Sequence, residues 1–117
     1  MSYVQGFLVP VRNADKEAYI ASARKAWPIF REYGASACYE CWGDEVPEGE
    51  VTSFPMAVKL EEDETVVFSW ILWPDKTSCD SCVASMESDE RWTEMGEMPF
   101  DGKRMIYGGF SPVFEGS

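Results

Sequence analysis

The segment from Thr65 to Trp73 constrains the fold more than any other part of the chain, because strong β-forming apolar residues fill almost all of it. The segments from Tyr3 to Val11 and from Arg104 to Phe114 are similar, with large apolar residues at both odd and even positions. Since successive side chains of a strand point to opposite faces, this pattern predicts strands that are buried on both sides of a sheet. Such a sheet needs cover on two faces.

The segments between these strands predict helices and shorter strands within a single domain of residues 1–117. A helical period and its end signals indicate one long helix that starts at Ala14 and stops at Gly34. The other expected elements are strands at Ser36 to Gly43 and Phe54 to Leu60, and helices at Thr77 to Ser88 and Asp89 to Met95. This order is the split βαβ arrangement of a ferredoxin-like α+β sandwich, with one additional short strand in the middle.

The helices of this arrangement can cover only one face of the sheet. A second copy of the same sheet is the simplest cover for the other face. We therefore expect a homodimer that packs sheet against sheet through a large apolar interface.

Charge and hydropathy narrow the classes of partner. The chain has 21 acidic and 10 basic residues, a formal net charge of -11, whereas a phosphate-binding surface needs the opposite sign, so we expect no nucleic-acid partner. The longest apolar stretch, Val66 to Trp73, is too short to span a bilayer, and the N-terminus lacks the pattern of a signal peptide. We expect a soluble, cytoplasmic protein with no membrane contact.

The sequence contains no histidine, which removes the commonest general base and the commonest metal ligand. Any chemistry must then use carboxylates, tyrosine, lysine, arginine or cysteine. We expect no cofactor.

Two cysteine pairs, Cys38/Cys41 and Cys79/Cys82, have the spacing that four-cysteine zinc sites use. The first pair falls within a predicted strand, where residues three apart face opposite sides, so we expect no metal centre. The second pair opens a helix, where thiolates are stabilised, which leaves a redox-active dithiol as an alternative to four reduced thiols.

Six short motifs resemble those of the YbaA-like family of small bacterial proteins, and together they extend over nearly the whole chain. They are Glu40-Cys41-Trp42-Gly43-Asp44, Val51-Thr52, Ala57-Val58-Lys59, Glu64 to Trp70, Trp73-Pro74 and Met98 to Phe110. The resemblance implies a dimeric α/β-barrel fold related to small monooxygenase and isomerase domains. It brings no established activity with it.

Polar residues on the second and last strands are the candidates for a site. Glu40 and Trp42 share one face of the second strand, and Gly108-Gly109 leaves room beside Tyr107. The turn before the last strand adds one anion and two cations: Asp101, Lys103 and Arg104. A carboxylate on an apolar sheet must be paired or solvated, so we expect Glu40 either to form a salt bridge with a cation such as Arg104 or to lie in a pocket with a raised pKa.

These residues suggest an acid–base site without histidine. Glu40 would be the base, Arg104 or Lys103 would hold an anionic substrate or a developing oxyanion, Tyr107 would donate a hydrogen bond, Trp42 would form a wall, and Asp101 would support them. We therefore expect a cofactor-free oxidase- or isomerase-like enzyme, or a small-ligand binder, that works in a cleft of the dimeric barrel. A non-catalytic dimeric interaction module is the alternative, followed by a CxxC redox protein.

Overall fold

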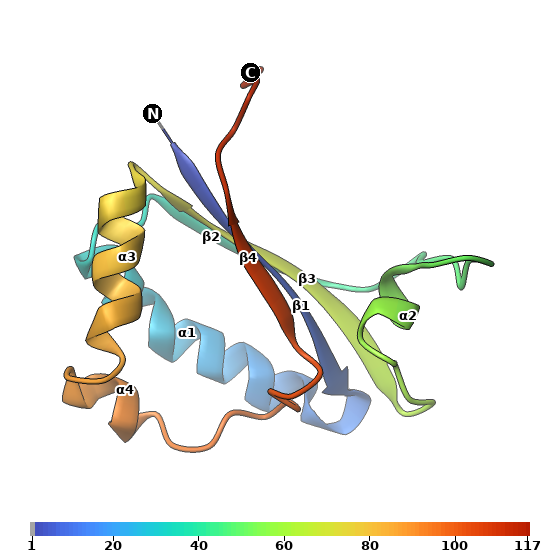
Figure 1. The fold of residues 1–117 in the computed structure, drawn as a ribbon. Helices are drawn as coiled ribbons and strands as arrows, with labels where there is room; N and C mark the ends of the chain where they lie inside the picture. Colours follow the sequence, from blue (N-terminus) through green and yellow to red (C-terminus); the bar gives the residue numbers. More distant parts are fainter. Residues whose placement is uncertain (1) are drawn as a thin grey trace.

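Two long apolar strands lie side by side at the centre of one antiparallel sheet. In the computed structural model, which describes residues 2–117, β1 (Tyr3–Arg12) pairs along its whole length with β3 (Glu64–Trp73). β2 (Ala37–Trp42) flanks β3, and β4 (Ile106–Phe110) flanks β1 (Figure 1). The resulting strand order, β2-β3-β1-β4, is that of a ferredoxin-like α+β fold, so the predicted fold class is confirmed.

The main helices lie together on one face of this sheet (Figure 1). They are α1 (Lys16–Glu32), which follows the short 3-10 turn η1 (Asn13–Asp15), then α3 (Lys76–Ser85) and α4 (Glu90–Glu94). The predicted helices are therefore confirmed, with ends that differ by a few residues.

Capping side chains fix where the later helices begin. Asp75 accepts a hydrogen bond from the backbone N–H of Ser78 at the start of α3. Asp89 caps α4 in the same way through the N–H of Arg91, and it also accepts a hydrogen bond from the hydroxyl of Tyr33. The cap of α4 thereby joins that helix to the end of α1.

The strand predicted from Phe54 to Leu60 is wrong. Residues Phe54–Ala57 form the short helix α2, because the Ser53 side chain accepts a hydrogen bond from the N–H of Met56 and a proline lies in the first turn. Proline lacks a donor for a strand ladder and fits the first turn of a helix. Within residues 2–117 the sheet accordingly has four strands, not five.

The last strand is shorter than the predicted Arg104 to Phe114. It begins at Ile106, because the residues before it form a turn, and it ends at Phe110, two residues before a proline. The glycine pair does admit a close neighbour, but that neighbour is Tyr3: a Cβ atom on Gly109 would lie 1.9 Å from the Tyr3 hydroxyl. The space beside the strand is thus filled by the protein's own tyrosine.

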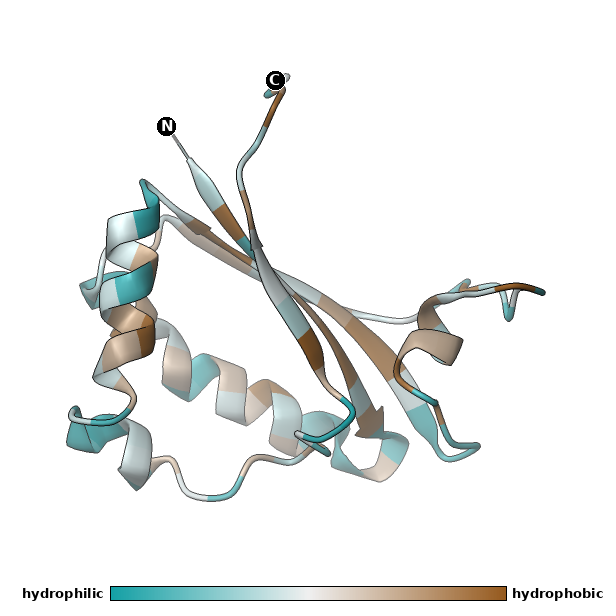
Figure 2. Ribbon diagram, in the orientation of Figure 1, coloured by the Kyte–Doolittle hydropathy of each residue, from teal (hydrophilic) through white to brown (hydrophobic). Residues whose placement is uncertain are grey.

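The helix-covered face holds two apolar clusters, and the hydrophobic residues concentrate on the central strands (Figure 2). One cluster is centred on Trp73 and Ile71 with the buried thiols of Cys79 and Cys82. The other consists of the buried residues Val9, Val11, Tyr19 and Val67. Both draw on β3, and they cover different ends of the sheet.

The opposite face is open in the described part of the chain and carries a row of aromatic rings. Tyr39 stacks on Trp70, Trp70 contacts Phe68, and Phe68 contacts Phe54 of α2, with ring centroids 5.0 to 5.8 Å apart. Tyr39 and Phe68 are about half exposed, at 53% and 46%. The expectation of an apolar sheet face that needs a partner agrees with this arrangement.

Candidate active site

A cavity of about 530 Å³ opens between the sheet and the helices, which is within the usual size range of a small-ligand site. Its floor comes from β1, β2 and β3, and its walls from α1, α3, α4 and the segment of residues 96–105, which we call the rim segment. Members of both apolar clusters line it. The cavity therefore occupies the layer between sheet and helices, on the side away from the open face.

Glu40 is the acidic side chain of the floor. It lies on the edge strand β2 opposite Ser69 of β3, and Ser69 in turn lies opposite Phe7 of β1. The hydroxyl of Tyr19, a buried residue of α1, donates a 2.6 Å hydrogen bond to Oε1 of Glu40. The second oxygen, Oε2, has the Cys38 thiol 4.0 Å away, and the Ser69 hydroxyl on the neighbouring strand also interacts with this carboxylate.

The surroundings shift the acidity of this pair. Burial among apolar groups raises the pKa of Glu40, and the hydrogen bond from Tyr19 opposes that rise without cancelling it. Burial and the neighbouring carboxylate raise the pKa of Tyr19, so Tyr19 remains a hydrogen-bond donor. Glu40 stays accessible to solvent through the cavity. A solvent-accessible carboxylate with a raised pKa is a suitable general base.

The rest of the lining is mostly apolar. Aromatic and methionine side chains supply much of it: Phe7, Phe30, Trp92, Phe100, Tyr107, Met86, Met95, Met98 and Met105. Four large hydrophobic side chains of the lining are substantially exposed and mark the mouth: Val83, Met86, Met98 and Tyr107. Gln5 adds a polar group whose oxygen is held by the indole N–H of Trp73 at 3.2 Å. Methionine fills irregular space adaptably, so these walls suit a flat apolar ligand.

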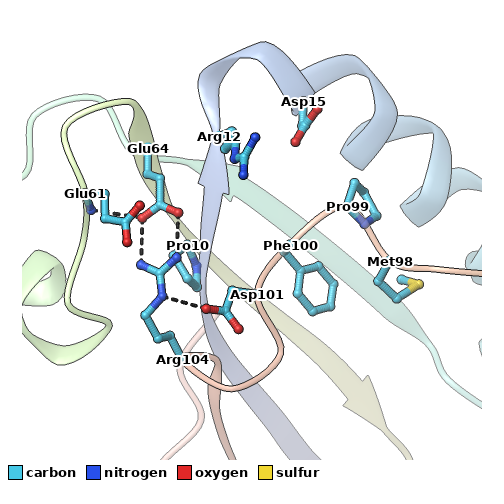
Figure 3. Close-up of a pocket in the computed structure, with 10 residues that line it drawn as sticks. All are labelled: Pro10, Arg12, Asp15, Glu61, Glu64, Met98, Pro99, Phe100, Asp101 and Arg104. Atoms are coloured by element: carbon cyan, nitrogen blue, oxygen red, sulfur yellow. Dashed lines mark hydrogen bonds and ion pairs between the residues drawn. The ribbon is translucent and has the colours of Figure 1, made fainter.

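A separate polar hollow of about 510 Å³ lies beyond the rim segment (Figure 3). There Arg104 makes a two-pronged ion pair with Glu64, at 2.6 and 2.7 Å, and a further bond of 2.9 Å to Asp101. Arg104 also donates to the backbone oxygen of Lys59. These bonds tie the end of the rim segment to the start of β3.

The expected Glu40–Arg104 salt bridge is wrong. Arg104 pairs with Glu64 and Asp101, and the partner of Glu40 is Tyr19. The alternative expectation for Glu40, a pocket with a raised pKa, agrees with the structure. The physical reason is that Glu64 is almost fully buried and needs a cation more than Glu40, which water reaches.

The other predicted site residues are divided between these places. Tyr107 lines the cavity at its mouth with 72% of its surface exposed. Trp42 lies on the same sheet face as Glu40 but packs on the second apolar cluster, with the Lys16 ammonium 5.1 Å from its ring centre. Lys103 and Asp101 belong to the turn beside the polar hollow, where the N–H of Lys103 bonds to Asp101. The structure thus brings Glu40 and Tyr107 to one cavity and places the others elsewhere.

The residues predicted for the site did not include Tyr19. A buried tyrosine hydroxyl usually has a hydrogen-bond partner, and that signal was available. Which partner it has depends on how α1 docks on the sheet.

The four cysteines are free thiols. Cys79 and Cys82 are buried against the Trp73 cluster, and burial raises the pKa of the Cys82 thiol to about 11. Cys38 lines the cavity, and burial likewise raises the pKa of its thiol to about 11. These environments disfavour the thiolate that redox chemistry requires.

Two features are absent from residues 2–117. No three acidic or cysteine side chains there lie close enough together to hold a metal ion. None of the helices described is long and apolar enough to cross a membrane.

Residues 2–102 match the model of a family described as a protein of unknown function, DUF1428. The chain belongs to this family. It is also 54% identical over 116 residues to the uncharacterized protein YbaA of Escherichia coli K12, and the match covers 98% of this chain and 99% of that one. The resemblance seen in the motifs is confirmed.

Solved structures with low identity share the fold. A cofactor-independent oxygenase from Streptomyces nogalater, SnoaB, aligns with a TM-score of 0.60 and 13% identity, over 97% of this chain and 95% of that one. A dimeric ferredoxin-like protein from an uncultured marine organism aligns with a TM-score of 0.57 and 11% identity, over 98% and 99% of the two chains. At these identities the likeness establishes the ferredoxin-like fold alone.

Proposed function

We propose that the cavity binds a small, mostly apolar carbonyl compound and that Glu40 acts on it as a general base. The observation that carries this proposal is a solvent-accessible carboxylate with a raised pKa on the floor of an apolar cavity, with one oxygen held firmly by the Tyr19 hydroxyl at 2.6 Å. A base of this kind is most effective when its pKa lies closer to the working pH than that of an ordinary carboxylate.

The reaction is a proton transfer. Glu40 Oε2 takes a proton from the carbon next to a carbonyl, the C–H electron pair becomes part of an enolate, and the carboxyl now holds the proton. The same carboxyl then returns the proton to the original carbon or to a conjugated one, which gives exchange or isomerisation without loss or gain of atoms. Tyr19 holds Oε1 so that Oε2 faces the ligand, and Tyr107 is placed at the mouth to donate a hydrogen bond.

Two facts support chemistry without a cofactor. The base and the donors that this reaction needs are side chains of the chain itself. In addition, SnoaB, which shares the fold, is described as a cofactor-independent oxygenase. We assign Arg104, with Asp101, to anchoring the rim segment, because their bonds lie in the separate hollow.

The test is deuterium exchange of 2-tetralone in D₂O, followed by NMR. We expect the protein to accelerate exchange next to the carbonyl and Glu40→Gln to lower that rate about 100-fold or more, the usual size of a general-base contribution. The matched control is Glu62→Gln, a change at an exposed acid in the turn before β3. Equal exchange rates for the protein and Glu40→Gln, with both folded, would contradict the assignment.

We further propose that the protein is a homodimer joined through the open sheet face. The aromatic row of Tyr39, Trp70, Phe68 and Phe54 supports this assembly, because a soluble monomer rarely leaves such a surface in water. The same aromatic row also supports a second candidate function, a non-catalytic interaction module that acts through its dimer surface. The exchange experiment separates the two, since a pure interaction module has no Glu40-dependent exchange.

A further inference from the structure

The charges around the cavity restrict its ligand further than the proposed reaction does. Within the described chain, no lysine or arginine lines the cavity, and Glu40 is its sole carboxylate. The rim segment does contain two cations, Lys103 and Arg104. Both belong to the turn beside the polar hollow and not to the cavity lining. A carboxylate or phosphate ligand would therefore lose its hydration in the cavity and lie near the Glu40 carboxylate, with no cation to compensate its charge.

The polar groups of the floor are few and mostly engaged. Oε1 of Glu40 accepts from Tyr19, and the side-chain oxygen of Gln5 accepts from Trp73. The strongest acceptor left for a ligand is the Glu40 carboxylate through Oε2, which has the Cys38 thiol 4.0 Å away, while the Ser69 hydroxyl on the neighbouring strand interacts with the same carboxylate. A hydroxyl has one proton to donate and matches this single acceptor, whereas an ammonium has three and would leave donors unpaired.

The walls add a preference for aromatic rings. Phe7, Phe30, Trp92 and Phe100 line the cavity, and Met86, Met95, Met98 and Met105 add polarisable sulfur atoms. Rings gain more from such walls than flexible chains do, because a ring loses little conformational freedom when it binds.

From this combination we infer that the natural ligand class is the uncharged, hydroxylated or enolisable aromatic compounds, bound with a hydroxyl on Glu40 Oε2 and the rings between sheet and rim segment. The inference rests on the proposed function for its site, and it adds that anions are rejected. Selection by charge is a property of binding, so it is measured separately from proton exchange.

The experiment compares three probes with the same rings: 2-naphthol, 2-naphthoate and 2-naphthylmethylammonium. Dissociation constants are measured by titration calorimetry at pH 7.5 on the full chain. We expect 2-naphthol to bind at least tenfold more tightly than either charged probe. In Glu40→Gln the disadvantage of 2-naphthoate should shrink several-fold, because the repelling carboxylate is gone.

A gain-of-binding variant tests the missing cation directly. Ser22 lies at the edge of the cavity on α1, where its hydroxyl meets the sulfur of Met98 at 3.8 Å. Ser22→Lys places an ammonium there and should raise the affinity for 2-naphthoate about tenfold, with 2-naphthol little changed. Ala21→Lys is the matched control, since it adds the same charge to the same helix at an exposed position outside the cavity lining.

Several results would overturn the inference: equal or tighter binding of 2-naphthoate or of the ammonium, no binding of 2-naphthol at millimolar concentration, or the same gain from Ala21→Lys as from Ser22→Lys. Failure of the proposed reaction looks different. In that case 2-tetralone exchange is independent of Glu40, while the order of affinities among the three naphthyl probes still reports on the charge of the cavity.

Discussion

The Tyr19 hydroxyl on α1 donates a 2.6 Å hydrogen bond to Glu40 on the edge strand β2, a contact between residues 21 positions apart. The helix thereby fixes the orientation of a carboxylate that its own strand leaves accessible to solvent. Because the tyrosine holds one oxygen of an accessible carboxylate, the pair resembles a base with its orienting group.

Tyr19→Phe should raise the pKa of Glu40 further, since it removes a donor that favours the carboxylate. The carboxyl carbon of Glu40, followed by NMR during a pH titration, measures the change. The cost in stability should be about 1 kcal/mol, because water can replace the lost donor at an accessible carboxylate. Tyr33→Phe is the matched control, as it removes a tyrosine bond to Asp89 and should leave Glu40 unaffected. An unchanged titration in Tyr19→Phe would contradict the role given to the hydroxyl.

Glu64→Gln should lower the free energy of unfolding by about 3 kcal/mol at pH 7, because it leaves Arg104 without its buried partner. The hydrogen bonds from Arg104 hold the pKa of Glu64 below the ordinary glutamate value of 4.5. The folded state therefore gains stability from the ionised form above that value, and the gain disappears as the pH falls through the lower folded-state pKa.

The difference between wild type and Glu64→Gln should accordingly shrink on acidification below about pH 4.5. Urea unfolding at several pH values measures it. Glu62→Gln, at an exposed position of the same turn, serves as the control and should differ from wild type by less than about 0.5 kcal/mol. A constant difference from pH 7 down to pH 3 would show that the ion pair is not its source.

Phe68→Glu should weaken the proposed dimer about 100-fold or more, because it places a charge in the middle of the aromatic row. Sedimentation velocity across a dilution series measures the effect, and circular dichroism checks that the chain is folded. Ala84→Glu adds the same charge to the exposed side of α3 and should leave the dimer intact. If wild type is a monomer at micromolar concentration, or if Phe68→Glu still dimerises as wild type does, the sheet face is not the interface.

Cys38 and Cys82 should react slowly with iodoacetamide at pH 8, because thiols with a pKa of about 11 are only about one part in a thousand ionised there. Alkylation followed by mass spectrometry should show the rate of both residues rising steeply between pH 9 and 11. Urea-unfolded protein provides the comparison, since ordinary thiols react readily at pH 8. Fast modification of Cys82 in the folded protein would reopen a redox role for the Cys79/Cys82 pair.

The sequence predicted the parts of the fold that depend on local pattern. The β-forming residues from Val66 to Trp73, interrupted only by Ser69, are enough to mark a central strand. The predicted strand from Phe54 to Leu60 failed because Ser53 caps a helical turn, and that short-range signal competes with a weak apolar pattern.

The site was harder to predict, because its contacts are long-range. The alternation of side chains along the second strand predicted that Glu40 and Trp42 share one face, which in the structure is the helix-covered face. The free-energy cost of a carboxylate on an apolar sheet predicted that Glu40 has either a partner or a pocket. Which carboxylate would pair with Arg104 depended on Glu64, 40 residues away and buried where β3 begins. The pairing was decided by the deeper burial of Glu64 relative to Glu40, and no pattern in the sequence reveals that difference.

The alternation of β3 has a consequence for how the protein can change over generations. Ser69 and Ile71 point into the cavity, while Phe68 and Trp70 belong to the opposite face. A substitution at one position therefore alters what the cavity accepts, and a substitution at the very next position alters what the outer face adheres to. A point mutation tunes one trait and spares the other. A deletion of one residue moves the side chains that follow it to the opposite face of the sheet and destroys both traits at once. This strand should therefore tolerate substitutions but not insertions or deletions.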